Sequence, residues 1–126
     1  MFRFERLDVC RKSALFADTV YKATASFPSK EVFGLTSQIR RAVASIGANI
    51  AEGSSRLSDK DFSRFVEIAY GSLCETISHL RLAKLQGFIS SDDFSPIYRS
   101  AEELGKMLSG LRETLGKWKV EASGGQ

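Results

Sequence analysis

Apolar residues recur along this chain at alternating steps of three and four positions, in four segments separated by short breaks. That spacing places them on one face of an α-helix, because a helix completes a turn about every 3.6 residues. The alternation at every second position that marks a half-buried strand is absent, and so are hairpin dipeptides flanked by alternating apolar residues. The sequence therefore predicts an all-α fold.

Residues that begin and end helices mark the boundaries of the four segments. Pro28 ends the first segment, and Ser29 is a candidate N-cap for the second. Gly53 ends the second segment, and Ser58, followed three positions later by an acidic residue, resembles a capping box at the start of the third. Two aspartates open the fourth segment, where the helix dipole favours negative charge. We expect helices at residues 5–26, 30–53, 58–87 and 91–119.

The connections between the segments are short, so helices that follow one another must lie antiparallel. Four helices with one apolar stripe each close most simply as an up-and-down four-helix bundle. The 126 residues suffice for one hydrophobic core. We therefore expect one domain over residues 1–120 and a loose tail over residues 121–126.

Two of the predicted helices are apolar on a second side as well. In the third helix, Ile68 and Leu82 lie opposite the stripe that contains Leu73, and the first helix shows a similar second side. A monomeric bundle has one interior, so we expect the second sides to bind further copies of the chain. The alternative is that they are ordinary scattered surface residues. The core stripe expected on the first helix is Leu7, Cys10, Ala14, Ala17 and Tyr21. The expected oligomer interface is Val9, Phe16, Val20, Ile68, Gly71 and Leu82.

The second helix carries a polar stripe beside its apolar one. Ser45 and Asn49 belong to it. The stripe is either a solvated face or a hydrogen-bonded one. The second interpretation is plausible because serine and asparagine have poor helix propensity at exposed positions. If Glu75 of the third helix is buried, it requires a cation or several hydrogen-bond donors, and Arg40 and Arg41 are the candidates. The hypothesis is a polar network that fixes the packing register, formed by Gln38, Arg41, Ser45, Asn49, Glu52 and Glu75.

The residue clusters that carry catalysis are missing from the sequence. His79 is the sole histidine and lies five positions from Cys74, an offset that turns the two side chains apart on a helix. Neither clustered metal ligands nor a phosphate-cradling glycine loop occurs. We therefore expect no enzyme, no metal and no cofactor. The two cysteines, Cys10 and Cys74, are expected to be free thiols buried as small hydrophobic side chains.

Basic residues gather around the start of the third predicted helix and one helix earlier. The formal net charge of +3 is mild, and neighbouring acidic residues dilute the cluster, so a solvated surface is the simpler interpretation for a monomer. In a symmetric oligomer the same patch is repeated, and phosphate contacts multiply. The candidate nucleic-acid-binding residues are Arg40, Arg41, Arg56, Lys60 and Arg64.

The longest apolar run is too short to cross a bilayer, and no basic stretch followed by an apolar stretch opens the sequence. We therefore expect a cytoplasmic protein without a membrane partner.

Several short runs follow one another along the chain in a characteristic order and spacing. They are Phe27-Pro28, Gln38-Ile39-Arg40-Arg41-Ala42, Ser45-Ile46, Asn49-Ile50-Ala51-Glu52-Gly53, Phe62-Ser63-Arg64-Phe65, Ala69-Tyr70-Gly71-Ser72-Leu73 and Glu75. This order and spacing resemble those of a known family, the 23S rRNA intervening-sequence proteins. The resemblance extends from about Phe4 to Ile89, with Gly47 at a position where the family often has proline.

The resemblance implies a four-helix bundle that assembles as a ring, typically a homopentamer. It also implies a relation to the accessory protein of diversity-generating retroelements, which binds nucleic acid and a reverse transcriptase. By that analogy the chain is expected to be an RNA- or DNA-associated accessory ring. The alternative is a protein-interaction scaffold that holds a partner protein without touching nucleic acid.

Overall fold

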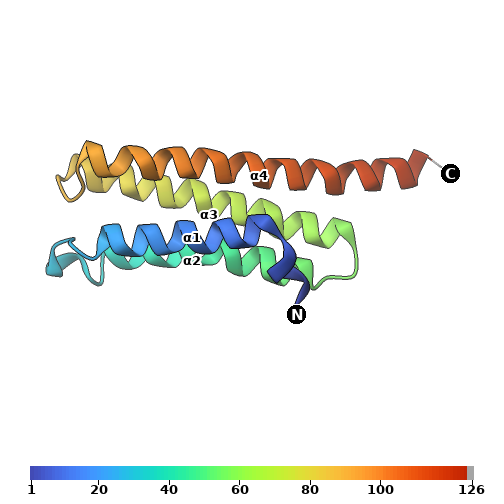
Figure 1. Ribbon diagram of the computed structural model, residues 1–126, viewed down its shortest axis with the longest axis horizontal. Coiled ribbons are helices and arrows are strands. Elements are labelled where there is room, and N and C mark those ends of the chain that lie inside the picture. Colours follow the sequence, from blue (N-terminus) through green and yellow to red (C-terminus); the bar gives the residue numbers. More distant parts are fainter. Residues whose placement is uncertain (125–126) are drawn as a thin grey trace.

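The computed structural model describes the backbone of residues 1–124 and the side chains of residues 1–116. Within these residues the chain forms an all-α, antiparallel up-and-down four-helix bundle, as predicted (Figure 1). The helices are α1 (Asp8–Thr24), α2 (Leu35–Ser54), α3 (Asp59–Leu85) and α4 (Ser91–Gly124), and the short 3-10 turns are η1 (Arg3–Arg6) and η2 (Ser29–Glu31).

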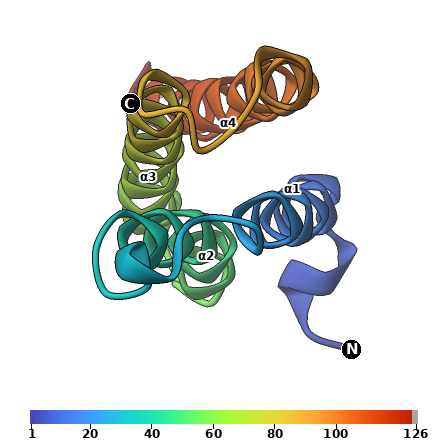
Figure 2. The ribbon, with the colours of Figure 1, turned by 90° about the vertical axis from the view of Figure 1, so that its left-hand side faces the viewer.

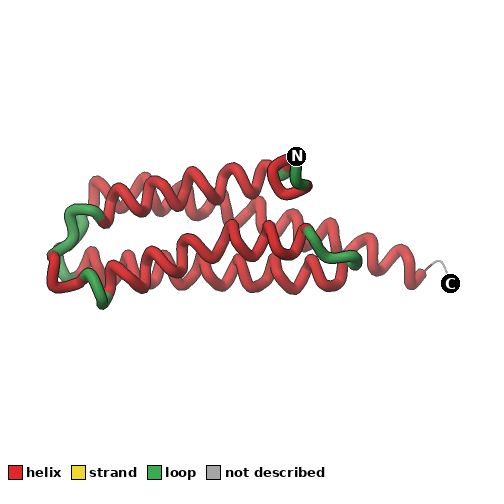
Figure 3. Tube along the Cα trace, turned by 90° about the horizontal axis from the view of Figure 1, so that it is seen from below, coloured by secondary structure: helices red, strands yellow, loops and turns green. Residues whose placement is uncertain are grey.

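Each helix packs against two others, because α1 closes the bundle against α4 as well as against α2. Viewed along the bundle, the four helices lie at the corners of a square in chain order (Figure 2). The connection between α2 and α3 lies at the end from which α4 projects beyond the other helices (Figure 3). This arrangement leaves α3 between α2 on one side and α4 on the other.

The apolar stripes predicted for α2, α3 and α4 supply most of the core. Leu73, which belongs to the stripe predicted on α3, is buried together with Val43 of α2, while Ile77 and Leu111 lie half-buried at the edge. The largest fully buried side chains on these helices are Ile39, Ile46, Ile50, Phe62, Val66, Leu80, Leu104 and Leu108.

The orientation predicted for α1 is wrong. Val9, Phe16 and Val20 are buried in the core of the monomer and are therefore not a free oligomer interface, whereas Ala14 and Tyr21 are exposed. The true core face of α1 also includes two polar residues, which interrupt the apolar spacing that marks a core face in the sequence. The Ser13 hydroxyl donates to the carbonyl of Val9 at 2.7 Å, and the buried Thr24 hydroxyl likewise donates to a carbonyl one turn earlier. Because these bonds satisfy both hydroxyls inside the helix, they can be buried at low cost.

The start of α2 also differs from the prediction. Ser29 does not cap a helix and belongs to η2, and α2 begins at Leu35. The carboxylate of Glu31 supplies the cap, accepting a hydrogen bond of 3.1 Å from the backbone N–H of Leu35. The predicted cap at Ser58 is confirmed, since its hydroxyl accepts a hydrogen bond of 3.1 Å from the N–H of Asp61.

The predicted end of the fourth helix is too early, because α4 continues to Gly124. Part of the segment predicted as a tail is therefore helical, and residues 125–126 lie outside the described residues.

Gly53 ends no helix, because α2 continues through it to Ser54. Its small size instead allows α2 to approach α3. A Cβ atom on Gly53 would lie 2.6 Å from the Cβ of Phe65 and 3.0 Å from Cδ1 of Phe62. Neither neighbouring atom is the far end of a flexible chain, so any side chain at this position forces the two helices apart.

We expect Gly53→Ala to lower the free energy of unfolding by about 1–3 kcal/mol, because overpacking outweighs the gain in helix propensity. Gly110→Ala is the matched control, since a Cβ there meets nothing within 4 Å. The free energy of unfolding of the control should rise by up to about 1 kcal/mol, from helix propensity alone. Urea denaturation measures both, and a Gly53→Ala variant as stable as the unmodified protein would refute the close contact.

Candidate nucleic-acid interface

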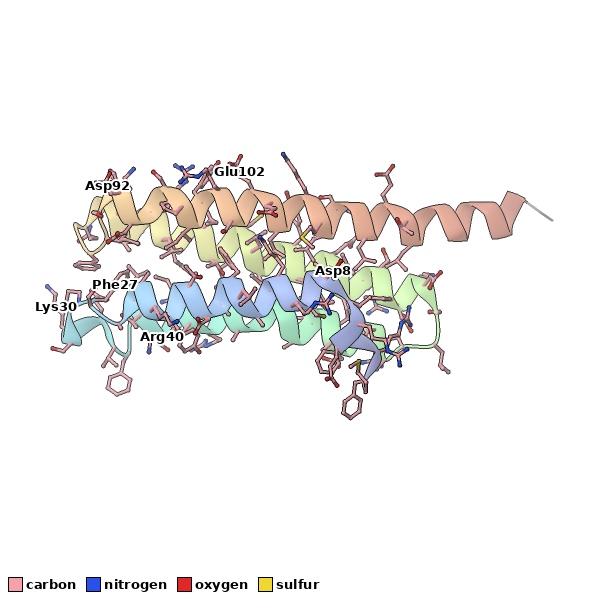
Figure 4. All side chains as sticks on the ribbon, in the orientation of Figure 1. Asp8, Phe27, Lys30, Arg40, Asp92 and Glu102 are labelled. Carbon is pink, nitrogen blue, oxygen red and sulfur yellow. The ribbon has the colours of Figure 1, made fainter. Side chains whose placement is uncertain are left out.

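The five basic residues predicted to bind nucleic acid do not form one patch. Arg40 and Arg41 lie in the first turns of α2, whereas Arg56, Lys60 and Arg64 lie around the connection between α2 and α3. The length of α2 separates the two groups by about 20 Å at a rise of about 1.5 Å per residue. Figure 4 places Arg40 near the opposite end of the bundle from that connection.

Arg40 is a structural residue of the α1–α2 contact. Its Nε donates to the Thr24 hydroxyl at 3.0 Å, and its Nη2 donates to the carbonyl of Tyr21 at 3.1 Å. The guanidinium also lies 4.7 Å from the centre of the Tyr21 ring. These contacts use two of the five N–H donors of Arg40 and hold its guanidinium in the α1–α2 contact, so it is poorly placed to bind a phosphate.

Two further members of the predicted set are neutralised by neighbours on the surface. Arg56 pairs with Glu52 at 3.0 Å and lies over the Phe65 ring, while Arg64 pairs with Asp61 at 3.3 Å. Arg41 and Lys60 are exposed, and neither has a carboxylate within ion-pairing distance among the described side chains. Of the predicted set, Arg41 in the first turns of α2 and Lys60 at the start of α3 are therefore the two exposed members without a carboxylate partner among the described side chains.

The predicted polar network is much smaller than expected. Ser45 Oγ and Ser72 Oγ share a hydrogen bond of 2.5 Å that joins α2 to α3, and Asn49 Nδ2 donates to the carbonyl of Ser45. Glu75 is exposed and contacts His79 at 3.3 Å, so it does not pair with either arginine of α2.

The other proposed members of the network lie outside it. Gln38 and Arg41 are exposed with no hydrogen bond from their side chains within the described part of the chain, and Glu52 pairs with Arg56. The network is therefore a single link between two serines, extended by one asparagine.

A groove of about 760 Å³ runs between α3 and α4, and residues of these two helices alone line it. Tyr70 and Leu73 form part of its apolar wall. On the α4 side, Gly105 and Gly110 have no side chains that would fill the groove. Its other lining residues are Cys74, Ile77, Ser78, Arg81, Tyr98, Ala101, Glu102, Lys106, Ser109 and Glu113.

A smaller hollow of about 330 Å³ shares Arg81 and Tyr98 with the groove. The Arg81 guanidinium lies 5.3 Å from the centre of the Tyr98 ring and 6.0 Å from that of Phe94. The ammonium group of Lys84 lies 5.2 Å from the centre of the Phe94 ring. The hollow is completed by Arg99 and Ser95 and contains no acidic lining residue.

Basic side chains on this face lack acidic partners. Arg81, Lys84, Arg99 and Lys106 are exposed, and within the described residues none lies in ion-pairing distance of a carboxylate. The acids that line the groove are Glu102, labelled in Figure 4, and Glu113. Sequence reasoning missed this face because its charges come from two helices and form no run along the chain.

The two cysteines differ in their surroundings. Cys10 is buried as predicted, and burial raises the pKa of its thiol. Cys74 is exposed and lines the α3–α4 groove, so the prediction that it is buried is wrong. The reason is that Cys74 lies beside the α3 core stripe on the side that faces the groove.

We expect iodoacetamide at about pH 8 to modify Cys74 at least about tenfold faster than Cys10. The thiolate is the reacting form, and a raised pKa leaves Cys10 with less thiolate at every pH below that pKa. Raising the pH should therefore narrow the difference. Peptide mass spectrometry after timed quenching measures both rates, and equal rates in the folded protein would contradict the assigned burial.

Among the described residues, no group of three or more histidine, cysteine or acidic side chains could hold a metal ion. None of the helices in that part of the chain combines the length and apolarity needed to cross a membrane.

Over the described residues the chain belongs to the class of all-α helix-bundle proteins, and it carries a basic face on α3 and α4. Residues 5–110 match the family described as 23S rRNA-intervening sequence protein, and the chain belongs to that family. A crystal structure of a protein of unknown function from the S23 ribosomal protein family of Bacteroides thetaiotaomicron is similar. The two chains are 30% identical with a TM-score of 0.74, and the match covers 82% of this chain and 97% of the other. A comparison with curated proteins gives no match.

Proposed function

We propose that this chain is a non-enzymatic cytoplasmic accessory protein that associates with nucleic acid as a ring-like homo-oligomer, a pentamer of the type that the family resemblance implies. The observation that carries the proposal is the α3–α4 face, where Arg81, Lys84, Arg99 and Lys106 have no carboxylate partner among the described residues. Unneutralised cations on one face bind phosphates and release the counterions around a polynucleotide.

The outer side of α3 supports self-association. Ile68 and Leu82 are 52% and 47% exposed, and a Cβ on Gly71 between them would meet nothing within 4 Å. Such a side lets a second chain approach closely and bury apolar area. The α1 residues predicted for the interface take no part, because they fill the monomer core.

We expect the double variant Ile68→Glu with Leu82→Glu to reduce the mass of the particle toward that of a monomer, because two charges would enter an apolar contact. Val32→Glu is the control, since Val32 is also 52% exposed but lies in the connection before α2. Light scattering with size-exclusion chromatography measures the mass. An unmodified protein that is monomeric at micromolar concentration would exclude the oligomer.

Nucleic-acid association predicts binding that weakens steeply with salt. Each phosphate contact should lower the association constant about threefold between roughly 50 and 200 mM salt, so an oligomer with several contacts loses affinity far faster than a monomer. Filter binding of a structured RNA at both salt concentrations measures this slope. Absence of retention at the lower concentration would refute the proposal.

A protein-interaction scaffold is the second candidate, and the exposed apolar side of α3 favours it. A reverse transcriptase is the partner that the resemblance to retroelement accessory proteins suggests. Affinity capture from cell extract with and without nuclease separates the two functions, because a protein partner that survives nuclease treatment supports the scaffold.

A further inference from the structure

Arg81 is held in position by aromatic rings while its donors stay unused. Its guanidinium lies against Tyr98 and Phe94, and no hydrogen bond from it occurs within the described residues. Phe94 is buried, and the centres of the two α4 rings are 5.9 Å apart, so Arg81 of α3 rests on a packed aromatic pair of α4. A planar fork of N–H donors held in this way matches the oxygens of a phosphate, and it loses little side-chain entropy on binding.

The surroundings of Arg81 separate charge along the site. Lys84 and Arg99 line the same small hollow, which has no acidic lining residue. The groove beyond Tyr98 is different, because its wall is largely apolar and Arg81 and Lys106 line it together with the acids Glu102 and Glu113. A phosphate is therefore favoured in the hollow over the groove, whereas a planar, largely apolar group suits the groove.

We infer that the α3–α4 groove binds a single-stranded polynucleotide, with phosphates on Arg81, Lys84 and Arg99 and a base stacked on Tyr98. Tyr98 is half-buried and lines both the hollow and the groove, so its ring lies where a base joined to a phosphate in the hollow would reach. A duplex keeps its bases paired and stacked, which leaves no free base for the groove. This inference rests on the proposed nucleic-acid association and names its site and substrate class.

Fluorescence anisotropy of a labelled oligouridine of about 20 nucleotides tests the site. We expect Arg81→Ala to weaken binding by roughly tenfold or more and to reduce its salt dependence. Arg112→Ala is the matched control, because it removes the same charge from α4 but its guanidinium already pairs with Glu67 of α3 at 2.7 Å. The control should bind within about twofold of the unmodified protein.

A second set of variants tests stacking separately from charge. Tyr98→Leu should weaken single-strand binding several-fold without changing the weaker binding of a duplex of the same length, and Tyr98→Phe should restore it because the ring is kept. Gly110→Trp should block the groove without disturbing the core, since a Cβ at Gly110 meets nothing within 4 Å. Circular dichroism confirms that each variant is folded.

The results separate failure of this inference from failure of the proposed function. If the unmodified protein binds the oligonucleotide but Arg81→Ala and Gly110→Trp bind equally well, the groove is not the site. Duplex binding as tight as single-strand binding, and equally sensitive to Tyr98→Leu, overturns the stacking. Displacement of the oligonucleotide by polyglutamate at lower concentration than by unlabelled RNA or DNA would identify an acidic peptide ligand instead. No binding to any polynucleotide overturns both proposals.

Discussion

The packing of α2 on α3 is the contact on which the remaining geometry depends. At Gly53 the two helices approach until only a hydrogen atom fits against Phe62 and Phe65, and farther along a bond between Ser45 and Ser72 joins them again. Two fixed points along a helix set both its distance and its rotation. The rotation of α3 then decides which of its residues face α4, which face the core and which remain outside.

That rotation gives the surface of α3 two different characters. Ile68 and Leu82 point away from the bundle, while Tyr70 and Arg81 lie on the side toward α4 and line the groove. An apolar side suited to self-association and a groove with an adjoining basic hollow therefore occupy separate sides of one helix. In a ring of identical chains, each copy would present its own groove, so weak contacts at single grooves would add along one polynucleotide.

The sequence predicted the helices of the bundle well where periodicity was carried by apolar residues, as in α2 with Ile39, Ile46 and Ile50. It failed for α1 because Ser13 and Thr24 occupy core positions, and hydroxyl groups bonded to their own helix look polar in a sequence. Gly53 was predicted to end a helix, whereas its observed role is to allow close contact with residues of another helix.

The candidate site was harder to predict because charge in a sequence does not show its partners. Arg56 and Arg64 count as positive residues, yet Glu52 and Asp61 on neighbouring turns neutralise them. Arg81 and Arg99 lie on different helices, so the sequence did not predict that they form one site. The α3–α4 contact places both around one hollow. Ion pairs with neighbouring acids, together with the packing of α3 on α4, therefore decide where cations without a carboxylate partner lie among the described residues.

Photo-crosslinking tests most directly whether nucleic acid binds between α3 and α4. An oligonucleotide that contains 4-thiouridine is bound to the intact protein, irradiated and digested, and the attached peptides are identified by mass spectrometry. The structure predicts attachment to peptides that contain Tyr98 or Tyr70, which line the groove. Attachment confined to peptides around Arg41 and Lys60, with none from the groove, would contradict it.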